Sequence, residues 1–271
     1  MSLITISRGI GCGGLIIARQ VAEALDLDLF DDQRLQEEAL RLGIRSKDLV
    51  SLDEKKPGLF DRILNRRPEL YLDFMEAVVY GVAQGGRGVI LGHGSQMLLR
   101  DFGCALHVHV HAHEAARVRN LMAHKGLSRE AAEKMIRQSD ARQRGFFQYA
   151  FHMDWKDPGL YDLIVNTEQI GIDLAAKLIT EAARSETMQA CSLTAVTAME
   201  RLSLKKKIEG FLLEKDINTA TLLIEVPEPG VAEVTGLAYS AEEKARIEAT
   251  LKSIPGLTEL RGSVNIMPTA L

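Results

Sequence analysis

The sequence predicts an α/β protein, built on a parallel β-sheet with helices on both faces, followed by a separate small α+β domain. Two observations lead to this fold class. Short apolar runs alternate with longer segments of helical periodicity as far as about residue 184, and such alternation is typical of a parallel sheet. Beyond that point the alternation of strands and helices ends. Two apolar runs are joined there by the turn signal Pro-Glu-Pro-Gly at residues 227–230, which indicates a pair of adjacent strands and a separate domain.

The apolar pattern places the elements of the sheet domain in order. LITI at residues 3–6 is expected to form a buried strand, and LIIARQVAEAL at 15–25 a helix with one apolar stripe. Further strands are expected at 27–30, 88–92, 104–112 and 161–167, and further helices at about 32–42, 69–84, 113–124, 128–143 and 170–184. A polar stretch containing Pro57 and Gly58 precedes the helix at 69–84.

The end of the chain is expected to fold in the order α-β-β-α-β. The predicted helices are 199–215 and 241–253, and the predicted strands are 220–226, 231–239 and 257–267. The segment between the two patterns is small and polar, as linkers often are. We therefore expect domains at 1–184 and 200–271, joined by a linker at 185–199.

Composition excludes several functional classes. The chain has 271 residues, of which 46% are hydrophobic and 26% charged, and its formal net charge is −4. That charge argues against broad attraction to nucleic acid or to anionic lipid. No apolar run approaches the roughly 20 residues of a membrane span, and we expect no secretion signal. Three widely spaced cysteines do not form a disulfide framework, so we expect a reduced, cytoplasmic protein.

A glycine-rich segment, SRGIGCGGLI at residues 7–16, follows the first strand. Gly9 and Gly14 have the spacing of the first half of the phosphate-binding motif G-x-x-x-x-G-K-[ST], but Leu15 and Ile16 replace its lysine and its hydroxyl residue. Glycines let successive backbone N–H groups turn toward one point, and the next helix adds its free amides. The loop is therefore expected to hold phosphate without a side-chain cation; the alternative is a plain turn that binds nothing.

Five segments carry a recognisable pattern in one order along the chain. They are ITISRGIGCGGLIIARQVAEALDLDLFDD, GHGSQMLL, LHVHVHAHEAARV, SDARQRGFFQYAFHMDW and YDLIVNT. Together they resemble the cytidylate kinase-like family of nucleoside monophosphate kinases, from residue 3 to about 183. The resemblance implies a P-loop kinase fold, ATP with Mg²⁺ as the donor if the protein is active, and a pyrimidine nucleoside monophosphate as the acceptor.

The same resemblance implies a set of site residues. Those implied to bind nucleotide or phosphate are Arg8, Gly9, Gly11, Cys12, Gly13, Gly14, His93 and Arg117. Those implied to act in catalysis, on a mobile lid, are Asp140, Arg142 and Arg144. Two departures count against efficient phosphoryl transfer, because Leu15 and His93 stand where the family has arginines. The three arginines at 117, 142 and 144 are also open to a plainer interpretation as surface cations.

The run LHVHVHAH places three histidines, His107, His109 and His111, on one face of an expected strand. Three imidazoles invite a zinc interpretation. Neighbours on one face of a strand are roughly 7 Å apart, however, so three in a row rarely converge on one ion. We therefore expect partly buried histidines bonded to backbone or water, and no tightly bound metal.

The C-terminal residues, about 200 to 268, resemble the BON domain. The matching segments are LKKKIEGFLLEK, VTG, SAEEKARIEATLKSIPGL and SVNIM. The resemblance suggests a lipid or protein partner. Three lysines at 205–207 form a basic spot that neighbouring glutamates offset, so an interaction module or a homodimerisation module stays open.

Three functional hypotheses follow. The first is a nucleotide-binding kinase that transfers a phosphoryl group from ATP, with activity weakened by the degenerate loop. The second is a non-catalytic nucleotide or anion sensor whose BON-like module contacts a membrane or a protein. The third is a structural scaffold that binds no ligand.

Overall fold

The computed structural model describes residues 2–44, 68–103, 105–189 and 193–267. The expected polar stretch around Pro57 and Gly58 and the first residue of the strand expected at 104–112 lie outside these ranges. The chain divides into two compact units. The first comprises Met1–Asp31 and Gly85–Ala195, and the second comprises Asp32–Gln84 and Val196–Leu271.

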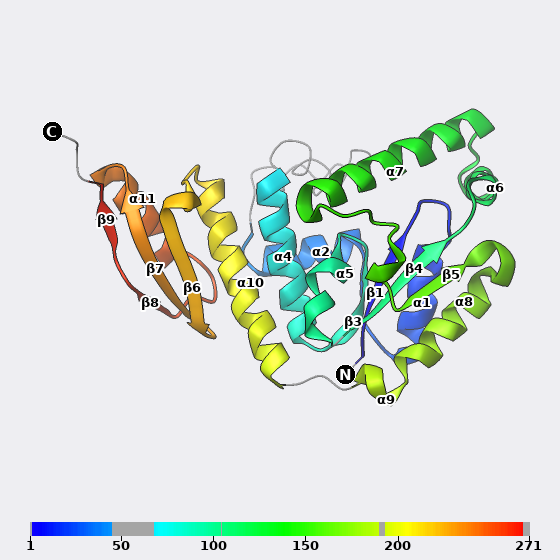
Figure 1. Ribbon diagram of the computed structural model, residues 1–271, viewed down its shortest axis with the longest axis horizontal. Helices are drawn as coiled ribbons and strands as arrows, with labels where there is room; N and C mark the ends of the chain where they lie inside the picture. Colours follow the sequence, from blue (N-terminus) through cyan, green and yellow to red (C-terminus); the bar gives the residue numbers. More distant parts are fainter. Residues whose placement is uncertain (1, 45–67, 104, 190–192, 268–271) are drawn as a thin grey trace. The chain divides into compact units, whose positions relative to one another are not determined.

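The first unit is built on a five-stranded sheet in the order β2-β3-β1-β4-β5, in which every neighbouring pair is parallel (Figure 1). The strands are β1 (Ser2–Arg8), β2 (Leu29–Phe30), β3 (Arg87–Leu91), β4 (Ala105–His111) and β5 (Leu163–Asn166). The central strands β1, β3 and β4 are buried along most of their length, as expected where both faces of a parallel sheet are covered. The parallel α/β architecture predicted from the sequence is confirmed.

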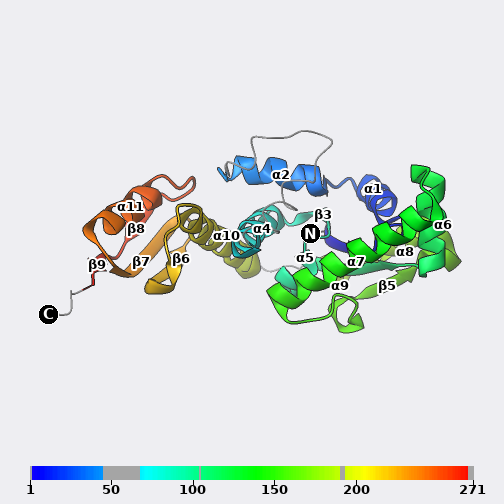
Figure 2. The ribbon, with the colours of Figure 1, turned by 90° about the horizontal axis from the view of Figure 1, so that it is seen from above.

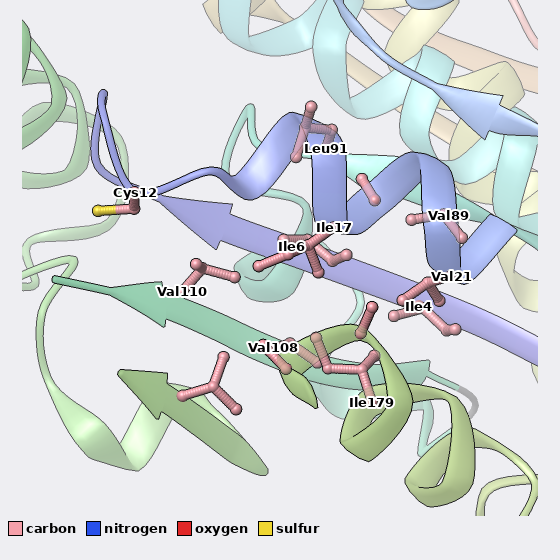
Figure 3. Close-up of a cluster of buried hydrophobic side chains, with 14 of the residues drawn as sticks. Ile4, Ile6, Cys12, Ile17, Val21, Val89, Leu91, Val108, Val110 and Ile179 are labelled. Atoms are coloured by element: carbon pink, nitrogen blue, oxygen red, sulfur yellow. The ribbon is translucent and has the colours of Figure 1, made fainter. Parts of the chain in front are cut away.

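One face of this sheet is covered by α1 (Gly14–Leu25) and α8 (Thr167–Ala183), which pack side by side (Figures 1 and 2). Figure 3 shows Ile4 and Ile6 of β1 meeting Ile17 and Val21 of α1, with Ile179 of α8 beside them. These side chains are completely buried. Their packing fixes the position of α1, and therefore of the loop that precedes it.

The opposite face carries α5 (Ser95–Leu98) and the segment that follows α7 (Arg129–Phe151). The remaining short or peripheral elements are α6 (Glu114–Lys125), α9 (Glu186–Gln189), η2 (Arg100–Phe102) and η3 (Pro158–Leu160). Figure 1 shows α7 lying beyond the carboxyl ends of β1 and β4, the edge at which open α/β sheets bind ligands.

The second unit contains a four-stranded sheet and four helices among its described residues. Its helices are α2 (Asp32–Arg41), α4 (Pro68–Gln84), α10 (Leu193–Glu214) and α11 (Ala241–Lys252), with a short η4 (Thr219–Thr221). Its strands are β6 (Leu222–Glu228), β7 (Val231–Ala238), β8 (Glu259–Arg261) and β9 (Val264–Ile266). Strand β7 is antiparallel to β6 and parallel to β8 and β9. The element order follows α-β-β-α-β, except that the last strand is broken in two at Gly262, whose φ is +89°.

Helices α4 and α10 approach each other closely within the second unit. The Ser203 hydroxyl donates to the Ala77 carbonyl at 2.7 Å, and a Cβ on Gly210 would collide with the ring of Phe74. The same ring meets Phe211 edge-on, with 6.4 Å between centroids. Small residues at the crossing therefore let α4, which precedes β3 in the chain, pack against a C-terminal helix.

Three element boundaries differ from the sequence-based expectation. Helix α7 runs to Phe151 and not to 143, because Gly145 is tolerated inside a long helix. Helix α8 begins at Thr167 and is interrupted at Gly171, which has φ +74° and ψ 172°. Helix α10 begins inside the predicted linker, since Ala195, Val196 and Ala198 continue a helix more readily than a loop.

The domain boundaries at 184 and 200 stay predictions. No described helix is long and apolar enough to span a bilayer.

Candidate phosphate-binding site

The glycine-rich loop occupies the turn between β1 and α1, as its sequence predicts. Gly11 and Gly13 have φ values of +84° and +79°, which glycine adopts readily and other residues do not. A Cβ on Gly11 would lie 2.8 Å from the carbonyl oxygen of Arg117, and a Cβ on Gly13 would lie 2.8 Å from Ile172 Cδ1. Both the backbone conformation and the crowding therefore require glycine.

Three successive carbonyl groups of this loop accept hydrogen bonds from side chains of α6 and α8. Arg117 Nε donates to the Ile10 carbonyl at 2.7 Å, and Asn120 Nδ2 donates to the Gly11 carbonyl at 2.9 Å. The Thr167 hydroxyl lies 3.0 Å from the Cys12 carbonyl. Because the N–H and C=O of a peptide group point in opposite directions, the amides of Gly11 and Gly13 point away from these donors.

The amides at the start of α1 add to the loop. No side chain caps this helix at Gly13, and the first N–H groups of a helix have no acceptor within it. These amides carry the positive end of the helix dipole. Together with the loop amides they make the backbone at the start of α1 positively polarised, which favours the binding of phosphate.

Arg117 and Asp140, which the resemblance assigned to phosphate binding and to the lid, bind each other. Arg117 Nη1 donates to Asp140 Oδ2 at 2.8 Å, and Nη2 donates to Oδ1 at 2.7 Å. The arginine is 6% exposed, and its Nε is occupied by Ile10. The pair therefore fastens the loop to α7, which is a positioning role that the sequence did not reveal.

The charge environment keeps Asp140 ionised. Burial by itself would raise the pKa of this carboxyl group, but the two hydrogen bonds and the charge of Arg117 hold its pKa below the ordinary value. The charges of Lys156 and Arg144 act in the same direction. The carboxylate therefore stays available to Arg117 throughout the neutral range.

The other predicted site residues lie at varying distances from this clamp. Arg142 and Arg144 are exposed on α7, and the described hydrogen bonds and ion pairs tie neither side chain to the loop. The Arg8 side chain passes between Gly14 and Gly92, since a Cβ on either glycine would meet it. His93 has φ +59° in the turn after β3, between two glycines that also have positive φ.

Cys12 contributes backbone only. Its side chain is 2% exposed and belongs to the same buried cluster, at the end of β1 where the loop begins (Figure 3). Burial raises the pKa of the thiol, so it is protonated and unreactive at neutral pH.

The histidine stripe lies on the face of β4 opposite α1, as its alternation predicts. His107 Nδ1 is 2.8 Å from the Thr5 hydroxyl. His109 stacks on Tyr161, with 4.9 Å between centroids, and meets the edge of Trp155 at 5.4 Å. Burial, with the charges of His111, Lys156 and Arg117, lowers the pKa of His109 to about 4. Within the described ranges no three His, Cys, Asp or Glu side chains are grouped closely enough to hold a metal.

A polar layer that the sequence did not predict joins β1, α5 and the segment that precedes β5. The Tyr161 hydroxyl donates to the Trp155 carbonyl at 2.5 Å, and it also lies 3.2 Å from Ser7 Oγ and from Gln96 Nε2. Four buried polar atoms in this region have no hydrogen-bond partner in the described structure: Ser95 Oγ, Gln96 Oε1, His109 Nδ1 and Trp155 Nε1. Asn120 and Thr167 were missed as well. Thr167 stands in the YDLIVNT segment, whereas Asn120 carries no sequence signal.

The donor set of the loop fits a phosphate chain but not its metal ion. Backbone amides suit phosphate oxygens. Position 16, where the common motif supplies a hydroxyl ligand for Mg²⁺, is Ile16, a 41% exposed apolar side chain with no oxygen to donate.

Comparison with known proteins agrees with this geometry. The chain belongs to the cytidylate kinase-like family, whose sequence profile matches residues 3–169. The cytidylate kinases of Pyrobaculum islandicum and Pyrobaculum arsenaticum are each 24% identical to it over 179 residues, which cover 66% of this chain and 90% of the relative. An uncharacterized protein from Eubacterium ventriosum has a similar fold, with a TM-score of 0.52 at 20% identity over 67% of this chain and 97% of its own.

These findings define a kinase-like nucleotide-binding fold. The family match ends at residue 169, so it carries no information on the C-terminal residues, and the resemblance to a BON domain stays a prediction.

Proposed function

We propose that the protein binds a nucleoside triphosphate through the backbone of residues 9–14 and transfers its terminal phosphoryl group, slowly, to a pyrimidine nucleoside monophosphate. The observation that carries this proposal is the set of three side-chain donors, Arg117, Asn120 and Thr167, that hold three successive loop carbonyls. Each anchored carbonyl turns the amide of the same peptide group to the opposite side of the loop, where an anion can accept a hydrogen bond from it. The membership of the cytidylate kinase-like family supports the nucleotide as the ligand.

The expected rate is low for a physical reason. Phosphoryl transfer is accelerated mainly by positioning and by charges placed where negative charge develops. Leu15 and Ile16 supply neither a cation nor a metal ligand next to the loop. Losing one such donor typically slows a reaction by about 10²–10³-fold, while ground-state binding survives better. ATP with Mg²⁺ remains the expected donor, with the metal bound chiefly by phosphate oxygens and water.

The test is calorimetry with ATP, with CMP and with both together, followed by a coupled assay for ADP release. Binding of ATP with slow turnover that requires CMP would support the proposal. Absence of ATP binding at millimolar concentration would overturn it. The variant Asn120→Leu removes the side-chain donor that holds the Gly11 carbonyl. It should weaken ATP binding, because the loop amides are then held less firmly, and the protein should stay folded.

A second candidate function is a non-catalytic sensor. It is favoured by the apolar residues at positions 15 and 16, and its output would pass through the BON-like module at 200–271 to a lipid or protein partner. ATP binding with no ADP release under any acceptor would select it.

A further inference from the structure

The loop has no cation at the position where such loops commonly carry one. Leu15 and Ile16 are both exposed apolar side chains, 39% and 41% accessible. The phosphate chain of a nucleotide carries several negative charges, and backbone dipoles alone offset them only in part. We propose that Lys156, in the segment after α7, supplies this missing positive charge and binds the phosphate chain. This proposal rests on the proposed nucleotide binding.

The backbone at Lys156 is held in a fixed conformation. Its amide donates to Asp154 Oδ1 at 3.0 Å, and the Asp157 amide donates to the Asp154 carbonyl at 3.0 Å. The preceding residue, Trp155, is 2% exposed and meets the ring of His109 on β4. Lys156 is thus anchored to the central sheet in spite of standing in an irregular segment.

The ammonium group lies next to the clamp that holds the loop. Lys156 Nζ is 3.9 Å from Asp140 Oδ2, and both oxygens of that carboxylate are bonded to Arg117. Arg117 in turn bonds the loop at Ile10. Lys156 Nζ also lies over the ring of Trp155, which meets the ring of His109 on β4.

Lys156 is available to a ligand where Arg117 is not. Arg117 is buried, and its Nε, Nη1 and Nη2 each donate to a protein oxygen. Lys156 is too far from Asp140 for a hydrogen bond, and its side chain is 46% exposed. Three cations, Arg117, Arg144 and Lys156, influence the single carboxylate of Asp140. The carboxylates of Asp154 and Asp157, which flank Lys156 in the chain, each accept a backbone amide, whereas the ammonium group of Lys156 reaches solvent, where phosphate can approach it.

A built-in reporter makes the proposal testable without turnover. Trp155 is the one tryptophan in the sequence, and Lys156 Nζ lies 5.2 Å from the centroid of its ring. If phosphate draws the ammonium group away from the indole, this cation–π contact weakens. ATP binding to the full-length protein should therefore change the tryptophan fluorescence, and adenosine should not.

The first experiment compares Lys156→Met with Lys134→Met, a substitution of an exposed lysine on α7. Because a hydrogen bond to a charged group contributes more than a neutral one, Lys156→Met should weaken ATP binding by about tenfold or more, with adenosine binding unchanged. Lys134→Met should bind like the wild type, and Lys156→Arg should keep most of the affinity. Equal ATP affinity in Lys156→Met and wild type would overturn the role of Lys156 and leave the proposed nucleotide binding intact.

The second experiment relocates the cation. Leu15→Lys should restore ATP affinity to Lys156→Met by a larger factor than it improves the wild type, because the two lysines then replace each other. Equal improvement in both backgrounds would mean that they act independently, and would overturn the proposal. If the wild-type protein itself fails to bind ATP, the proposed function fails with it. Thermal unfolding of each variant confirms that the fold is retained.

Discussion

At the scale of single residues, Arg117 has the most consequential role. It joins the glycine-rich loop, α6 and α7 at one point, because one guanidinium group satisfies a loop carbonyl and a carboxylate on different elements. A planar guanidinium with five donors is well suited to this task, and lysine is not. The family resemblance singled out both residues, but it implied that Arg117 binds phosphate and that Asp140 acts on a mobile lid. Their pairing became visible only in three dimensions.

Asp140→Asn tests the clamp. The substitution leaves Arg117 buried without its charged partner, so we expect a loss of about 2 kcal/mol in the free energy of unfolding. Urea denaturation at pH 7 measures it. Asp173→Asn, at an exposed site on α8, should change stability much less. Unchanged stability together with lost ATP binding would instead indicate that Asp140 acts on the nucleotide.

His109 should give the protein an acid-sensitive stability. Its pKa is about 4 in the folded state and about 6.5 in the unfolded chain. The unfolded state therefore binds more protons as pH falls from about 6.5 to about 4, and the native state loses up to roughly 3 kcal/mol across this window.

His109→Phe keeps an aromatic ring and removes the titration. The difference in unfolding free energy between wild type and variant should therefore shift in favour of the variant as pH is lowered from 7 to 4. Urea denaturation at four pH values measures it. The raised pKa of Asp73, which burial brings to about 6, acts in the opposite direction but cancels between the two proteins. Parallel pH profiles would contradict the prediction.

At the scale of elements, the glycine-rich loop forms the turn that its sequence predicts, and tertiary contacts hold it in place. Its glycines predicted a strand-to-helix turn, and the structure adds the side chains of α6 and α8 that hold its carbonyls. Helix boundaries were less predictable. Helix α7 continues past Gly145, whereas α8 is interrupted at Gly171, where φ is +74°, so a glycine in a helical pattern had two different outcomes.

Gly11→Ala should damage both the loop and its binding. It forces a Cβ into the left-handed region and toward the Arg117 carbonyl, so we expect a loss of about 1–3 kcal/mol in stability and a marked loss of ATP affinity. Thermal unfolding and calorimetry measure the two effects. Gly145→Ala is the control, because a Cβ at this position would meet nothing within 4 Å beyond the neighbouring backbone of its own helix, and alanine favours a helix by up to about 1 kcal/mol.

At the scale of the whole molecule, the two compact units do not follow the order of the chain. Residues 32–84 lie between β2 and β3 of the first sheet in sequence, yet they group with 196–271. The reason is visible at Ser203, Gly210 and Lys206 of α10, each of which contacts α4. Apolar periodicity predicts both helices but does not say which helix either one packs against.

Lys206 stabilises the pairing of these two helices. Its Nζ lies 2.9 Å from Glu76 Oε2, 2.9 Å from Glu209 Oε2 and 3.3 Å from Asp73 Oδ1. Lys206→Met leaves three partly buried carboxylates facing one another, so we expect a loss of about 2 kcal/mol at pH 8.

The pH dependence of this variant distinguishes charge from packing. Burial raises the pKa of Asp73 to about 6 in spite of Lys206, and without the lysine it rises further. The folded state then binds more protons than the unfolded state, so the deficit of Lys206→Met should shrink as pH falls from 8 to 5. Chemical denaturation at both pH values measures it, with Lys205→Met as the neighbouring control. A deficit that is equal at both pH values would indicate lost packing alone.

The sequence by itself determined the parallel α/β architecture, the glycine turn and the face of the histidine stripe, because each follows from local periodicity and backbone conformation. Only the tertiary structure decided that Arg117 binds Asp140, that Asn120 and Thr167 hold the loop, and that α4 packs against α10. Those contacts join residues far apart in the chain. Local patterns fix which residues are helical or extended, whereas the pairing of distant side chains is fixed by the packing of whole elements.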